Sequence, residues 1–314
     1  MLHPGTSGAL WGKPRARDGN RKANTVTGDE HFFDNLSASE GEFCEEIIDR
    51  LNGEAWAAPL LAALSGAGGI CREAKSFLFE LRFANALHEA GVVPDYEIPG
   101  EGSSTIDFGF EHGGQRWAVE LMRLEETAAA IDATKSTTDA TGTTWISRNL
   151  SSTAKDKRQT EEGETVKAVQ RICQKCEKDG RPYKFPEPTE AYNVILVDFR
   201  TFLHGGDEYD RIHVALGGKC LKSGFLQRFF KGKLISGVFD KDTMLKGANE
   251  AQERVHFIGF VKEKKYESGE FAQCTQFVAN PRLFKSEEEV LDAIAKWSLQ
   301  PAEVLNVKRK NKKS

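Results

Sequence analysis

The segment from Phe77 to Arg123 constrains the fold of this chain most, because a helix pattern precedes two strand patterns within it. From Phe77 to Glu89 apolar residues recur at spacings of three and four, which predicts a largely buried helix. Gly91 follows at the position of a left-handed C-terminal cap, so the helix is expected to end there. The chain must then cover one face of a sheet with this helix.

The two strand patterns lie after a predicted loop that contains Pro94, Pro99 and Gly100. Apolar and other residues alternate from Ile106 to Phe110 and again from Trp117 to Leu121, with Gly113-Gly114 between them. Alternation with a period of two is typical of half-buried strands, and paired glycines suit a tight turn. The sequence therefore predicts an antiparallel hairpin.

Three acidic residues occupy defined positions in this helix and hairpin. Glu80 lies between the apolar rows of the helix, so its carboxylate is expected to be sheltered and to need a partner. Asp107 and Glu120 lie on the strand faces opposite their apolar neighbours, and a hairpin can bring them side by side. A hard divalent cation would offset their repulsion. Each acid alone also fits an ordinary solvated or turn-forming residue, so the prediction depends on the ordered set.

This order of a helix glutamate, a hairpin aspartate and an acid-x-basic strand resembles the core of the PD-(D/E)XK nuclease superfamily. The resemblance implies that Asp107 is the metal-binding aspartate, Glu120 the acid of the last half-motif and Glu80 the first-helix glutamate. The family lysine would fall on Met122, which carries no charge, while Arg123 is expected to point to the opposite face of the strand. Met122 leaves the fold expectation standing and puts catalysis in question.

A helix pattern from about Glu164 to Lys178 supplies candidates for the missing charge. The superfamily core also has a helix after its motif strand, and in some branches the lysine has moved to a neighbouring element. The resemblance therefore makes Lys167 and Gln170 candidate catalytic residues. A merely solvated basic helix face explains the same pattern equally well.

The remaining patterns predict an α/β fold with a mixed central sheet flanked by helices, and the resemblance implies a restriction-endonuclease-like core. The near-continuous apolar run from Tyr192 to Phe199 fits a central strand covered on both faces. Two more strands are predicted within Arg254–Val261 and Phe271–Val278, and a capped helix within Ser286–Trp297. The expected organisation is a disordered tail (1–28), an N-terminal helical region (29–76), a core (77–300) with a polar insertion (124–165), and a basic tail (301–314).

Charge is divided unevenly along the chain. Residues 1–130 hold 11 Lys and Arg against 21 Asp and Glu, a net charge of −10, whereas residues 131–314 hold 32 against 26, a net charge of +6. A nuclease needs an acidic part for metal ions and a basic part for phosphates, although neutral proteins show such a division by chance. No run of apolar residues approaches the length of a membrane span, and the N-terminal residues lack the apolar segment of a secretory signal. A cytoplasmic location is therefore expected.

Cys173 and Cys176 form a single C-x-x-C pattern without a second pair, so reduced cysteines are expected and a zinc site is not.

The leading hypothesis is a Mg²⁺- or Mn²⁺-dependent nuclease acting on nucleic acid, DNA more than RNA, with no membrane partner. Asp107, Glu120 and Glu80 would hold the metal. The alternatives are an inactive nuclease-fold protein that binds nucleic acid or a protein partner, and a structural protein unrelated to nucleases. The sequence does not fix the oligomeric state.

Overall fold

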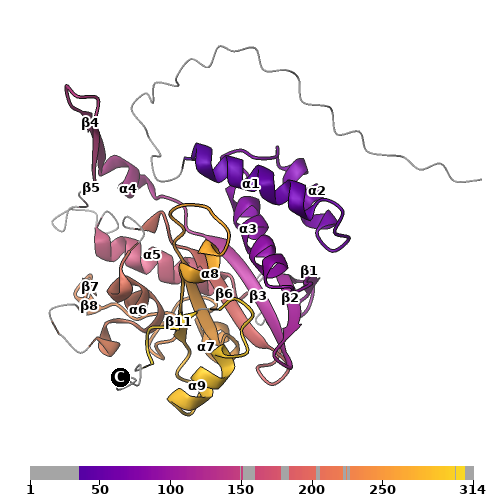
Figure 1. The fold of residues 1–314 in the computed structure, drawn as a ribbon. Helices are drawn as coiled ribbons and strands as arrows, with labels where there is room; N and C mark the ends of the chain where they lie inside the picture. The colour runs from indigo at the N-terminus through magenta and orange to yellow at the C-terminus, as the bar shows by residue number, and fades with distance from the viewer. Residues whose placement is uncertain are drawn as a thin grey trace, which may run out of the picture.

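A computed structural model describes residues 35–148, 150, 160–177, 184–202, 206–221, 224, 227–300 and 302–307. Its centre is a seven-stranded sheet with helices on both faces (Figure 1). The strands, in sheet order, are β1 (Asp95–Pro99), β2 (Thr105–His112), β3 (Gln115–Arg123), β6 (Tyr192–Asp198), β9 (Phe257–Val261), β10 (Thr275–Ala279) and β11 (Glu303–Val304). The expected α/β fold with a mixed, helix-flanked sheet is confirmed.

The sheet changes from antiparallel to parallel at its centre. The strands β1, β2 and β3 form an antiparallel meander, and β3 then pairs in parallel with β6, and β6 with β9. The last two contacts are antiparallel for β9 with β10 and parallel for β10 with β11. A parallel neighbour requires a crossover, and helix α5 (Glu161–Gln174) lies in the connection from β3 to β6.

Alternation along each central strand divides the core into two layers. On β3, Trp117, Val119 and Leu121 pack with one layer, whereas Ala118 and Met122 pack with the other. The first layer is covered by α1 (Ala38–Leu51), α2 (Ala58–Gly66), α3 (Lys75–Glu89), α8 (Glu270–Gln273) and α9 (Glu287–Ile294). The second is covered by α5, α6 (Glu208–Leu216) and α7 (Ala248–Arg254). The N-terminal helices therefore share one core with the sheet.

Two local expectations were wrong. The segment around Pro94 and Pro99 is the edge strand β1, not a loop, because its backbone pairs with β2. The segment 254–261, expected to be a strand, is strand only from Phe257, since α7 ends at Arg254.

The region 124–165, predicted to be a polar insertion, contains α4 (Ala128–Asp132), the hairpin β4 (Thr134–Thr138) and β5 (Thr144–Arg148), and the start of α5.

Three predictions concern residues outside, or mostly outside, the described part of the chain. The disordered tail 1–28 lies outside it, as do 149 and 151–159 of the insertion and most of the basic tail.

A short hairpin, β7 (Phe229–Phe230) with β8 (Lys233–Leu234), and the 3-10 turn Gly218–Cys220 complete the elements of the described residues. All six cysteines are described, and each of them is free.

A buried network of charged side chains joins α1 and α3 to the ends of β6 and β9. Arg82 donates to Glu40 and to Glu263, each at 2.8 Å, and Arg200 pairs with Asp198 at 2.5 Å and with Glu40 at 3.1 Å. Lys75 lies 3.5 Å from Glu40. We call these six residues the charge cluster. Because buried charges need partners, the mutual pairing explains how the protein tolerates them.

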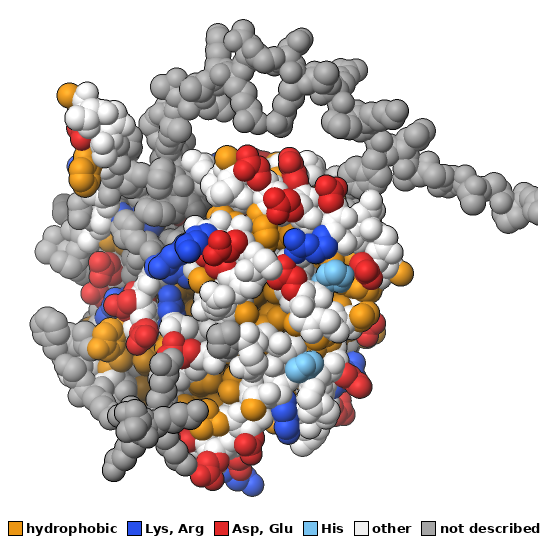
Figure 2. Space-filling model, viewed as in Figure 1, with side chains coloured by type: hydrophobic (Ala, Val, Ile, Leu, Met, Phe, Trp, Pro, Cys, Tyr) orange, Lys and Arg blue, Asp and Glu red, His pale blue; other side chains and the backbone are white. Residues whose placement is uncertain are grey.

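The surface repeats the uneven charge of the sequence. Figure 2 shows acidic side chains gathered over α1 and α2, where the exposed face of α1 carries Glu42, Glu45, Glu46 and Asp49. A polyanion would be repelled from this face. Among the described residues, no helix is both long and apolar enough to cross a membrane.

Candidate functional site

The site forms where the pairing of β2 with β3 stops. The recorded register runs from His112 opposite Gln115 to Phe108 opposite Val119. Asp107 and Glu120 are the next residues of the two strands, and the ladder ends before them. Ile106 packs with the second core layer whereas Phe108 packs with the first, so β2 changes face at Asp107. Instead of a ladder bond, the Leu121 N–H donates to Asp107 Oδ2 at 2.6 Å. The hairpin thus brings together the two acids that the sequence pattern paired.

Glu120 is the most enclosed of the three acids, with an exposed fraction of 0%. Its Oε1 accepts from Lys175 Nζ at 2.8 Å and lies 2.5 Å from Lys184 Nζ. Its Oε2 is buried and has no hydrogen-bond partner among the described residues. A carboxylate oxygen left in this state costs free energy unless another ligand satisfies it.

Glu80 reaches the site from α3. Its Oε2 accepts from the Tyr96 hydroxyl of β1 at 2.8 Å. Burial raises the pKa of Glu80 to about 7, opposed by the Tyr96 hydrogen bond and the charge of Lys175 and reinforced by the charge of Glu120. The carboxylates of Glu80 and Glu120 therefore interact electrostatically within the site.

Asp107 shows the larger shift. Burial, followed by the charge of Glu120, raises the pKa of Asp107 to about 8, while Lys175 and the Leu121 N–H act in the opposite direction. Lys175 responds to the same acids. Burial disfavours its charged form, but Glu120 and Asp107 more than offset this and raise the pKa of Lys175. An excess of acids over nearby cations is what a site for a further cation requires.

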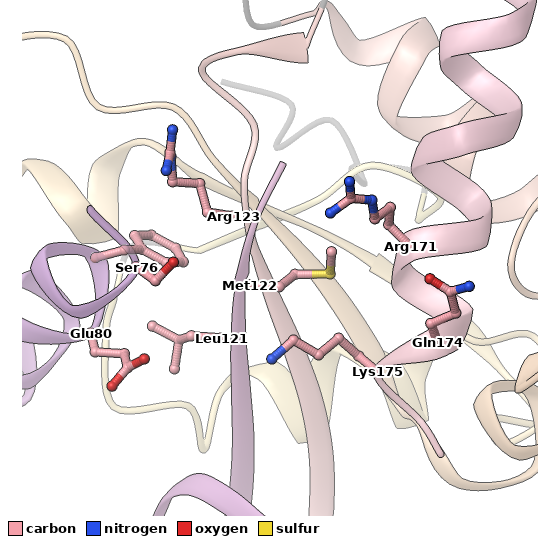
Figure 3. A pocket seen from close by; sticks show the side chains of 9 residues that line it. Ser76, Glu80, Leu121, Met122, Arg123, Arg171, Gln174 and Lys175 are labelled. Carbon is pink, nitrogen blue, oxygen red and sulfur yellow. The ribbon is translucent and has the colours of Figure 1, made fainter. Parts of the chain in front are cut away.

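A cavity of about 280 Å³ opens beside these groups, between α3 and α5. Figure 3 shows Glu80 on the α3 side of β3 and Lys175 extending from the end of α5 toward β3 from the other side. Met122 points toward α5 and Arg123 points away from it, as expected for neighbours on one strand. Arg171 and Gln174 line the α5 side of the cavity. Lys175 thus links the cavity to the buried Glu120.

The structure does not bring Lys167 and Gln170 to this cavity. Lys167 pairs with Glu164 at 3.1 Å and lines a separate small cavity near Thr127, while Gln170 is exposed. Lys175, Lys184 and Tyr96 are the polar residues of the site that the sequence reasoning missed. The sequence could not align α5 with β3, because a long insertion of unknown path separates them.

The three acids do not form a complete ligand set for a metal ion. Within the described part of the chain, no group of three or more His, Cys, Asp or Glu side chains is placed to hold one. Asp107 lies close enough to Glu120 for the charge of Glu120 to raise its pKa, and Glu80 is tied to Tyr96. Glu120 Oε2, which lacks a partner among the described residues, is the oxygen that the site offers to a cation.

Comparison with family models, with curated proteins and with solved structures gives no match to this chain.

Proposed function

We propose that this chain is a metal-dependent nuclease that hydrolyses phosphodiester bonds in nucleic acid, DNA more than RNA. One observation carries the proposal: Asp107 and Glu120 interact where their hairpin stops pairing, and Glu120 keeps an unsatisfied oxygen. Acidic pairs of this kind attract a hard divalent cation. The order of α3, the β2–β3 hairpin and α5 also supports the resemblance to the PD-(D/E)XK superfamily and its restriction-endonuclease-like core.

The donor set suits Mg²⁺ or Mn²⁺, which prefer carboxylate oxygens and keep several waters. Asp107 and Glu120 would hold the ion, with Glu80 as a ligand through water. When bound, the ion supplies a Lewis acid for the scissile phosphate and lowers the pKa of an attacking water. The raised pKa of Asp107 means that its proton must leave when a cation binds, so binding is coupled to pH.

Lys175 takes the role that Met122 cannot fill. Its ammonium group lies 2.8 Å from Glu120 and lines the cavity, where a phosphate oxygen has room to approach. A fixed ammonium group at this position stabilises negative charge as it develops on the phosphate. Arg171, on the same side of the cavity, adds positive charge for the nucleic-acid backbone.

A second candidate function is binding of nucleic acid or a partner protein without cleavage. Met122 stands at the lysine position, and the amines of Lys175 and Lys184 already contact one oxygen of Glu120. Two amines on one carboxylate can replace a cation rather than assist it. This candidate differs from the first in its dependence on metal, since binding through lysines and arginines needs none.

The deciding experiment is cleavage of labelled single- and double-stranded DNA and RNA with Mg²⁺ or Mn²⁺. Wild type is compared with Asp107→Asn and Glu120→Gln, which keep the size of each side chain. Glu111→Gln, on the same hairpin but at an exposed position, is the matched control. Metal-dependent cleavage that is lost in the first two variants and kept in the control supports the nuclease. A folded wild type that binds these substrates but never cuts them supports the second candidate.

A further inference from the structure

A second cavity, of about 420 Å³, lies at the opposite end of β3 from the candidate site. Gln115, the first residue of β3, and Tyr192, the first residue of β6, line it together with residues of α9. Seven residues separate Gln115 from Met122, which corresponds to roughly 23 Å along a strand. The volume is within the range of small-molecule sites, and none of its lining residues belongs to the site described above.

Aromatic rings form one wall of this cavity. The centroid of Tyr192 lies 4.9 Å from that of His256, and His256 lies 5.7 Å from Phe284. Both pairs are close to edge-to-face, so the rings hold each other in place. The wall is therefore a fixed aromatic surface against which a flat or cationic group can pack.

His256 contributes a hydrogen-bond donor to this wall. Only 4% of the residue is exposed, and its Nδ1 accepts from the Asn193 N–H at 3.1 Å. That bond requires the other nitrogen, Nε2, to carry the proton, and burial lowers the pKa of His256 to about 4, so the ring is neutral. No described residue accepts a hydrogen bond from Nε2. Since His256 lines the cavity, a ligand there is the available acceptor.

Two carboxylates from α9 also line the cavity. Glu289 and Asp292 both line the cavity, and after burial their charges are the causes that raise the pKa of Tyr192. Among the described residues that line the cavity, the single lysine or arginine is Lys296, one turn after Asp292. Two acids against one base leave the cavity negative, which disfavours a phosphate or carboxylate ligand and favours a cation.

We propose that this cavity is a binding site for a guanidinium group, such as the side chain of an arginine within a peptide. The flat face of the group packs on Tyr192 and Phe284, and its N–H groups donate to Asp292 and Glu289. The peptide carbonyl beside it accepts from His256 Nε2, which explains why a donor and two acids line the same cavity. An ammonium group lacks both the flat face and the forked donors.

Calorimetric titration of the full chain with N-acetyl-arginine amide tests the proposal. The matched probe is N-acetyl-citrulline amide, which has nearly the same shape but no charge. We expect the arginine probe to bind and the citrulline probe to bind at least about tenfold more weakly, the size of a lost charged hydrogen bond. Failure of wild type to bind the arginine probe, or equal binding of both probes, would overturn the proposal.

Two variants on α9 sharpen the test. Asp292→Asn is expected to weaken binding of the arginine probe by about tenfold. Glu287→Gln removes the same charge from an exposed position of this helix that does not line the cavity, and it is expected to leave binding unchanged. Equal affinities of the two variants would contradict the proposal, because a general attraction to α9 would then explain the binding.

The arginine can come from another molecule or from this chain, since residues 308–314, outside the described part, include Arg309 and four lysines. A variant with these five cations replaced by serine distinguishes the sources. Tighter binding of the probe to this variant identifies the chain's own segment as a competitor. Equal binding identifies a separate peptide as the source, and both results retain the site.

Discussion

The acids of the charge cluster and those of the candidate site differ in how completely they are paired. In the charge cluster, Asp198 forms an ion pair with Arg200 and lies 3.9 Å from Arg82. Burial favours the neutral form of Asp198, but the two guanidinium groups outweigh it and hold the pKa of Asp198 well below its usual range. In the candidate site, Asp107 has one backbone donor and lies close to Glu120, and its pKa rises to about 8. Both are aspartates buried on the same sheet. Their surroundings alone give one a permanent charge and the other a proton at neutral pH.

The difference teaches which buried acids stabilise the fold and which are available for another task. Saturated acids such as Asp198 hold helices and strands together, and their function is complete without a ligand. In the candidate site, Glu120 keeps one oxygen without a hydrogen-bond partner among the described residues, and the raised pKa of Asp107 shows that its carboxylate form is poorly compensated. Incompletely paired buried acids of this kind are typical of functional sites.

The largest expected effect is on stability in the charge cluster. Asp198→Asn leaves Arg200 and Arg82 with less negative charge around them, and we expect the free energy of unfolding to fall by about 3–5 kcal/mol. Urea denaturation at neutral pH measures this. The wild-type contribution of Asp198 is present above the ordinary pKa of aspartate and is lost as pH falls, because its folded pKa is depressed. A change of under about 1 kcal/mol would mean that the cluster is not paired as described.

Asp107→Asn, measured in the presence of a chelator, is expected to raise the free energy of unfolding at high pH, whereas Asp198→Asn lowers it. The folded pKa of Asp107 is raised, so its stabilising contribution is present below about pH 4 and is lost as pH rises toward 8. The variant has no carboxylate to ionise at this position. Its free energy of unfolding should therefore exceed that of wild type by an amount of the order of 3 kcal/mol at about pH 9, and the difference should vanish near pH 4. Thermal or urea unfolding across this pH range provides the measurement. A variant less stable than wild type at high pH would contradict the comparison.

Lys167 on α5 and Lys175, which caps the C-terminal end of α5, distinguish the sequence-based prediction from the geometry of the structure. Lys175→Gln should lower the cleavage rate by about 10²-fold, because it removes the ammonium group next to Glu120. Lys167→Gln should change the rate by less than about threefold, since Lys167 pairs with Glu164 away from the cavity. Single-turnover cleavage of the preferred substrate compares them. The reverse order of effects would restore Lys167 as the catalytic residue.

Tyr96→Phe should have the smallest effect. The Tyr96 hydroxyl donates to Glu80 and opposes the rise in its pKa, so its removal should raise the pKa of Glu80 further. The pH of half-maximal cleavage should then move upward by up to about one unit with little change in the maximal rate. A pH profile of cleavage for the two proteins reveals the shift. An unchanged profile would show that Glu80 does not titrate during the reaction.

The sequence predicted the elements whose patterns are local. The period of the apolar residues placed α3, β2 and β3 and assigned Glu120 to the face opposite Val119 and Leu121. The assignment of Asp107 to the face opposite both Ile106 and Phe108 was wrong, because these two residues pack with different core layers. The helix α9 begins at its predicted cap, Ser286, whose Oγ accepts from the Glu289 N–H. Helix α6, by contrast, was missed, although the side chain of Asp207 caps it.

The parts that the sequence could not predict depend on distant contacts. The segment that forms β1 contains prolines and was expected to be a loop, yet pairing with β2 makes it a strand. Lys184 reaches Glu120 from a segment 64 positions further along the chain, and periodicity carries no information on such a contact. The pairing of Arg82 with Glu263 is likewise set by tertiary packing.

The most direct test of the central claim is calorimetric binding of Mn²⁺ to the metal-free protein, in buffers of different ionisation enthalpy near neutral pH. Because Asp107 and Glu80 hold protons there, with pKa values of about 8 and 7, binding should release protons. Asp107→Asn should abolish both binding and release, whereas Glu111→Gln should preserve them. Absence of binding to wild type, or binding that survives Asp107→Asn, would contradict the assignment of these acids to a metal site.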